Sequence, residues 1–291
     1  MRFRLTLASL LTAIALPALA AAPQPQGHYH LYQFHKSVVP LAAGQTMEYF
    51  GGSVTSSVNV VAVMWGANVP SSTVKGIGGF FQALVNSTYV DQLTQYSTVG
   101  ITGVNGKPGT NQTIGRGTFS GTITITPVNT STHLSDIAIR KELVGQIRAG
   151  NLPRPSANLL YMVYFPQNVV ITLGGSRSCV SFGAYHEAVS GKPDKNNIFY
   201  GVMPDCGGGF TSITDVTSHE FAEAITDNIP TPGSNPAYPQ AWNTSNGSEL
   251  GDLCEGYNGS LNDTTTNMSY TVQEVFLNST GACSTGNFTS P

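Results

Sequence analysis

A histidine and two glutamates in the stretch TSITDVTSHEFAEAITDN, residues 211–228, have the types and the spacing to do chemistry at a metal ion. His219 and Glu223 are four residues apart, so on a helix both side chains project over the same turn. An imidazole and a carboxylate held in this way suit a divalent metal such as zinc. Glu220 could polarise a water bound to that metal and serve as its general base. The pattern HExxE differs from the zinc-peptidase motif HExxH in its second ligand.

The stretch has the pattern of a helix with one apolar side. The apolar positions are Ile213, Val216, Phe221, Ala224 and Ile225. This spacing predicts that one stripe of the helix faces a core. Ser212 followed by Asp215 resembles a capping box at its start, and Asn228 and Pro230 end it. An exposed acidic helix face would show the same polar residues, so the helix alone does not establish a metal site.

A third metal ligand is expected from the segment SELGDLC, residues 248–254. Glu249 and Asp252 come about thirty residues after His219. We expect one of these acids to bind the metal and the other to orient a metal-binding residue by hydrogen bonding to it. The sequence does not decide which acid has which role. The alternative is a turn in which both acids cap backbone amides.

His186 closes the segment FGAYH and is the second histidine that could take part. It could bind the metal, or donate a hydrogen bond to an oxyanion that develops in the substrate. A buried histidine with a structural hydrogen bond is the alternative interpretation.

Four cysteines in an exported chain predict two disulfides. Three pairings are possible. We favour Cys179 with Cys206 and Cys254 with Cys283, because each pair brackets one folded segment.

The N-terminal sequence predicts export. Residues 1–22 contain two arginines, an apolar run and then small residues, which is typical of a signal peptide that is cleaved near Ala20 to Ala22. No later stretch is apolar enough to span a bilayer, so we expect a secreted, extracellular protein with no membrane span after cleavage. Residues 23–46, with His28, His30 and His35, are expected to form an N-terminal segment or pro-region. A formal charge of −3 and the absence of a basic run give nucleic-acid binding no electrostatic support.

The density of N-x-S/T tripeptides favours a glycoprotein with an exposed surface over residues 243–287. They begin at Asn86, Asn111, Asn129, Asn243, Asn246, Asn258, Asn262, Asn267, Asn278 and Asn287. Polar loops rich in Asn, Ser and Thr would also produce such tripeptides by chance.

The remaining elements predict an α/β (α+β) fold. Buried strands are expected at 58–66, 157–165, 169–173 and 197–204, helices at 71–96 and 133–149, an exposed strand or hairpin within 100–127, and a closing strand at 270–278. No glycine-rich phosphate-binding pattern follows the first strand, which argues against nucleotide binding. We expect residues 47–291 to form a single zincin-like domain with a mixed sheet and a long central active-site helix.

Four blocks of the chain resemble the EXORDIUM/phosphate-induced-protein family. They are VNVVAVMWG, FGAYH, SHEFAEAITDN and AWNTSNGSELGDLCEGY, and the resemblance spans roughly residues 55–285. It implies an extracellular protein linked to growth or to the cell wall, with the HExxE helix and the ELGDLC segment in one site. This chain departs from the family in having fewer cysteines and a polar insert at 258–267.

The sequence therefore predicts a secreted zinc-dependent hydrolase, a metallopeptidase that acts on a protein or peptide substrate. His219 and Glu223 would bind zinc with Glu249 or Asp252, and Glu220 would be the general base. The alternative is a non-catalytic extracellular signalling or cell-wall-associated glycoprotein with a structural metal, and its partners would be cell-wall components. Calcium is a further possibility because carboxylate-rich sites favour hard cations.

Overall fold

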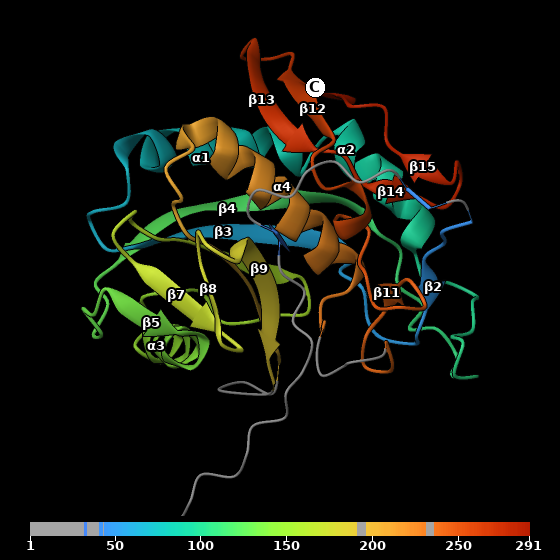
Figure 1. Ribbon diagram of the computed structural model, residues 1–291, viewed down its shortest axis with the longest axis horizontal. Helices are drawn as coiled ribbons and strands as arrows, with labels where there is room; N and C mark the ends of the chain where they lie inside the picture. Colours follow the sequence, from blue (N-terminus) through green and yellow to red (C-terminus); the bar gives the residue numbers. More distant parts are fainter. Residues whose placement is uncertain (1–31, 34–40, 43, 191–195, 231–235) are drawn as a thin grey trace, which may run out of the picture.

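The computed structural model describes residues 32–33, 41–42, 44–190, 196–230 and 236–291. The predicted signal peptide, and most of the predicted N-terminal segment with its three histidines, lie outside these residues. The described chain is a mixed α/β structure built on a six-stranded sheet (Figure 1). Within the described residues, no helix combines the length and the apolar composition needed to cross a membrane.

The sheet combines parallel central strands with antiparallel strands at one edge. In spatial order its strands are β1 (Tyr32–Gln33), β9 (Phe182–Val189), β10 (Ile198–Met203), β6 (Leu159–Tyr164), β3 (Ser57–Trp65) and β4 (Gly115–Ile125). Strands β10, β6, β3 and β4 run parallel to one another, whereas β9 is antiparallel to β10 and β1 is antiparallel to β9. Strands β6 and β10 are buried throughout, which explains why both read as unbroken apolar runs.

Each face of the sheet has its own layer (Figure 1). One face carries α1 (Ser71–Leu84) and α4 (Gly209–Thr226), and the other carries α3 (Asp136–Arg148). A small sheet of β5 (His133–Ser135), β7 (Val170–Leu173) and β8 (Ser176–Arg177) lies beside α3. The side chains of β3 alternate between the two cores, as the period of a strand requires.

The remaining elements are short, and part of the chain after α4 returns over that helix. The smaller elements are α2 (Thr88–Asp91), η1 (Gln92–Tyr96), β2 (Glu48–Tyr49), β11 (Trp242–Asn243), η2 (Asp252–Cys254), β12 (Asn258–Asp263), β13 (Met268–Gln273), β14 (Phe276–Leu277), β15 (Ala282–Cys283) and β16 (Asn287–Ser290). Strand β13 packs along α4.

Cys254–Cys283 ties η2 to β15, and Cys179–Cys206 ties the segment before β9 to the loop before α4. Both disulfides are therefore the predicted ones.

Several sequence-based predictions were wrong in detail. The helix predicted over 71–96 is interrupted because Ser87 Oγ accepts a hydrogen bond from Tyr89 N at 3.2 Å and starts a new turn. The region 100–127, predicted to hold an exposed strand or a hairpin, contains the single half-exposed strand β4, which pairs in parallel with β3, and β7 lies outside the main sheet. The predicted closing strand is divided into β13 and β14.

The predicted capping box does not start the central helix. Helix α4 begins at Gly209, three residues before Ser212, and no side-chain hydrogen bond caps it within the described residues. Asp215 instead lies inside the helix, where its carboxylate accepts a hydrogen bond from Tyr32 Oη at 3.2 Å.

The predicted exposed surface over 243–287 is only partly exposed. Asn243 is fully buried, and its amide nitrogen donates to Asp227 Oδ2 at 2.6 Å. A glycan at Asn243 would break this contact, so the role of Asn243 is structural and it is not a glycosylation site. The asparagines at 246, 258, 262, 267, 278 and 287 are exposed.

Candidate metal centre

Helix α4 is buried on all its sides from Ile213 to Thr226, including the side that carries the acids. His219 and Glu220 have no exposed surface, and Glu223 is 1% exposed. The interpretation of this helix as an exposed acidic face is therefore wrong. Strand β13, strand β9 and residues 248–254, which include η2 and are called the η2 segment, cover it, and each brings polar groups to the same place.

The first group of side chains joins α4 to the η2 segment. His219 Nε2 lies 3.1 Å from Glu223 Oε2, as expected for residues one helical turn apart. The backbone N–H of Asp252 donates to Glu223 Oε1 at 3.1 Å. Ligand atoms of His219, Glu223 and Asp252 all lie within 4.8 Å of one another. These three side chains form a potential metal-binding set.

Glu249 enters the cluster from a different side. Its backbone N–H donates to Asp252 Oδ2 at 2.9 Å, and its carboxylate Oε1 lies 3.6 Å from His186 Nε2. The two acids that the sequence could not tell apart therefore differ in their neighbours. Asp252 faces the pair His219 and Glu223, whereas Glu249 faces His186.

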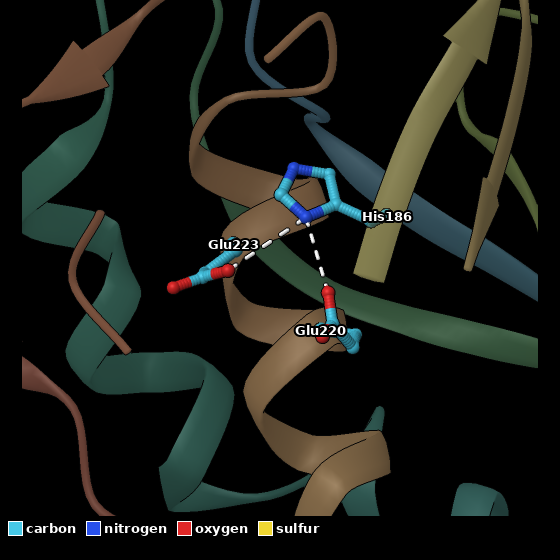
Figure 2. A group of neighbouring side chains, drawn as sticks. All are labelled: His186, Glu220 and Glu223. Carbon is cyan, nitrogen blue, oxygen red and sulfur yellow. Dashed lines mark hydrogen bonds and ion pairs between the residues drawn. The ribbon is translucent and has the colours of Figure 1, made fainter. Parts of the chain in front are cut away.

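His186 projects from β9 towards the carboxylates of α4 (Figure 2). Its Nδ1 lies 3.3 Å from Glu220 Oε2 and 3.7 Å from Glu223 Oε2. Its Nε2 lies 3.1 Å from the backbone oxygen of Asp227, which can only accept, so Nε2 carries a proton. A histidine held in this way presents Nδ1 to its other neighbours as a base, a metal ligand or, when protonated, a cation. His186, Glu220 and Glu223 form a second set that could hold a metal.

Two residues that the sequence analysis missed hold His219 in place. Gln273 Nε2, from β13, lies 2.9 Å from His219 Nδ1 and donates to the backbone oxygen of Gly251 at 2.9 Å. When the ring is neutral, Nδ1 accepts from Gln273 and the proton on Nε2 faces Glu223. A metal ion at Nε2 would replace that proton, and rotation of the Gln273 amide would then present Oε1 to an Nδ1–H group.

Gly251 lets the backbone of the η2 segment approach these side chains closely. A Cβ atom at this position would lie 2.7 Å from His219 Nδ1 and 2.8 Å from Glu223 Oε1. No pattern in the sequence marks Gly251 or Gln273, because their roles depend on contacts between distant segments.

The cluster is rich in acidic groups. Four carboxyl groups, from Glu220, Glu223, Glu249 and Asp252, meet two imidazoles, so the acids outnumber the bases by two. Burial raises the pKa of Glu220 and of Glu249 well above the ordinary value for a carboxyl group. Burial lowers the pKa of His219, but the Glu223 carboxylate more than reverses this and holds it well above its ordinary value.

The donor atoms fit a divalent cation. Glu220 Oε1 is buried and makes no hydrogen bond to any described residue, whereas His219 Nε2 faces the Glu223 carboxylate at 3.1 Å. Buried carboxylates held close together repel one another, and a cation between His219, Glu223 and Asp252 would offset their charge. Nitrogen and oxygen donors together suit zinc and its neighbours in the first transition row, whereas the oxygen-rich composition also admits calcium.

Gln273 is expected to act through the orientation of His219. Gln273→Met keeps the length of the side chain but removes its hydrogen bonds to His219 and Gly251, so metal affinity should fall about 10- to 100-fold. Competition with a chromogenic chelator measures this. Gln273→Glu, which restores an acceptor for Nδ1–H, should recover part of the loss, and equal affinity of the parent and the Met variant would exclude this role.

The structure thus brings together all six predicted site residues, namely His186, His219, Glu220, Glu223, Glu249 and Asp252. The neighbours that the sequence analysis did not identify are Asp227, Gly251, Gln273 and Tyr32. Comparison of the chain with protein-family models, with curated proteins and with solved structures found no match.

Proposed function

We propose that the protein is a secreted zinc-dependent hydrolase of the metallopeptidase class. The observation that carries the proposal is the convergence of His219 and Glu223 with Asp252, an acid from a distant segment, inside 4.8 Å. The proposal includes a zincin-like fold, supported by the 18-residue helix α4 packed on a mixed sheet beside the antiparallel strand β9. It also includes membership of the EXORDIUM/phosphate-induced-protein family. The two disulfides are in keeping with secretion.

In this proposal His219, Glu223 and Asp252 hold the metal and Glu220 is the general base. When bound, zinc would lower the pKa of a water molecule towards neutrality and polarise the carbonyl of the substrate. Glu220 Oε1, which makes no hydrogen bond to the described residues, would take a proton from water and pass it to the leaving amine. Burial raises the pKa of Glu220, so the carboxylate is a stronger base than an exposed one.

His186 would hold Glu220 in position. Its Nδ1 lies 3.3 Å from Glu220 Oε2, which leaves Oε1 for the proton transfer. In the protonated form His186 could also stabilise negative charge that develops on the substrate. Two carboxylate ligands would make bound water less acidic than in a histidine-rich site, so slow turnover or a preference for another divalent metal is expected.

The burial of the cluster favours a second candidate, a non-catalytic extracellular or cell-wall-associated glycoprotein with a structural metal. His186, His219, Glu220, Glu223 and Glu249 are all at most 2% exposed. A structural metal site is closed in this way, whereas a catalytic site keeps one position open to the substrate.

Peptide hydrolysis separates the two candidates. The purified protein is incubated with casein and with a peptide library, before and after treatment with a chelator. We expect cleavage that is lost on chelation and restored by zinc but not by calcium. A metal that resists chelation in a protein without hydrolysis would support the structural role instead.

The two acids of the η2 segment should differ in their effect on the metal. Asp252→Asn removes charge from the group that includes His219 and Glu223, so metal affinity should fall about 100-fold or more. Glu249→Gln changes a side chain that faces His186, and its effect should be at least about tenfold smaller. Chelator competition measures both, and the reverse order would assign the third ligand to Glu249.

A further inference from the structure

One side of the metal-binding cluster is covered by Tyr32. Its ring meets the His219 imidazole edge-on, with the ring centres 5.0 Å apart and the planes at 89°. Its hydroxyl donates to Asp215 Oδ2 at 3.2 Å. Asp215 precedes His219 by one helical turn, so Tyr32 contacts two successive turns of the same face of α4.

Strand pairing brings Tyr32 to this place. Strand β1 adds to the edge of the sheet antiparallel to β9, with Tyr32 opposite Ala184 and Gln33 opposite Phe182. His186, a member of the cluster, is two residues further along β9 than Ala184 and therefore on the same face of the strand. The edge of a sheet offers N–H and C=O groups to any extended chain that can reach it. In this structure β1 occupies the edge beside the cluster.

A cleft of about 440 Å³ is lined by Tyr32. Its walls include Gly183 from β9, Ile213 and Val216 from α4, and Glu255. Tyr32 lines this cleft and also contacts His219, which has no exposed surface. Tyr32 thus stands between the cleft and the cluster.

We propose that β1 is an inhibitory strand, which closes the site by occupying the place of an extended peptide on β9. This inference rests on the proposed function, because it concerns access to the same site. While β1 is paired, Tyr32 covers His219, and β1 occupies the adjoining part of the β9 edge. Displacement or proteolytic removal of β1 joins the cleft to His219 and frees that edge for an extended polypeptide.

The test measures access to His219 in the full-length secreted protein stripped of metal. The parent, Tyr32→Ala and Tyr32→Phe are treated with diethyl pyrocarbonate, and the modification of each histidine is followed by peptide mass spectrometry. In Tyr32→Ala, His219 should react at least about tenfold faster than in the parent, because its cover is gone. Tyr32→Phe keeps the ring and should stay within about twofold of the parent. The exposed His133 is the internal standard and should react equally in all three.

This readout requires neither metal nor turnover. An unchanged rate at His219 in Tyr32→Ala overturns the inhibitory strand, even if the protein hydrolyses peptides. Faster modification without any peptide hydrolysis in Tyr32→Ala establishes the cover and contradicts the proposed function. Thermal unfolding checks that the variants are folded, and Tyr32→Val replaces Tyr32→Ala, with the same expected result, if the latter does not fold.

Discussion

Glu220→Gln is expected to leave the bound metal in place and to lower peptide hydrolysis by about a hundredfold to ten-thousandfold. The amide has nearly the shape of the carboxylate but cannot accept the proton of the attacking water. Glu220 is not one of the three proposed ligands, which are His219, Glu223 and Asp252, so the metal content should not change. Steady-state kinetics on one peptide and elemental analysis of the same sample measure the two quantities.

A matched substitution at a distant glutamate controls for the loss of one charge. Glu48 lies on β2 and belongs to neither potential metal-binding set, so Glu48→Gln should keep both activity and metal content. A Glu220→Gln protein that cleaves as well as the parent would show that another group is the base. Loss of both metal and activity would place Glu220 among the ligands, as its closeness to His186 and Glu223 also allows.

Gly251→Ala is expected to weaken metal binding strongly, although it replaces none of the ligand residues. The new Cβ would lie 2.7 Å from His219 Nδ1 and 2.8 Å from Glu223 Oε1, so both side chains must move. The backbone at Gly251 has φ −74° and ψ −41°, which alanine adopts freely, so the effect is steric. Metal affinity should fall about 100-fold, and the free energy of unfolding should fall by about 1–3 kcal/mol from the overpacking.

Gly145→Ala is the control for this substitution. Gly145 lies within helix α3, and an added Cβ would meet no described atom within 4 Å. Alanine there should raise the free energy of unfolding by about 0.5–1 kcal/mol and leave metal affinity unchanged. Urea denaturation and chelator competition measure both variants. Full metal binding in Gly251→Ala would mean that the η2 segment does not pack against the ligands.

The parts of the fold that were predictable from sequence are those whose pattern is local. Strands β3, β6 and β10 have long apolar runs because most of their residues are buried, and α3 shows a helical period. The pairing of His219 with Glu223 follows from the geometry of one helical turn. The disulfides were predictable because each spans a single folded segment.

The parts that were missed depend on contacts between distant segments. Strand β9 carries His186 and Glu187 next to each other, which interrupts both an apolar run and a simple alternation. Both residues are buried because each has a partner far along the chain, Glu220 for His186 and Arg140 for Glu187. The choice between Glu249 and Asp252 likewise depends on the η2 turn, whose geometry no sequence pattern specifies.

Metal stoichiometry of the purified protein is the most direct test of the metal centre. Elemental analysis should find about one zinc per chain, and the zinc should be lost when His219 is replaced by alanine because that substitution removes the only nitrogen donor of the three-residue set. A folded protein that takes up no divalent metal when zinc is supplied in excess would contradict the account. The buried acids would then be neutralised by protons, and the cluster would have only a structural role.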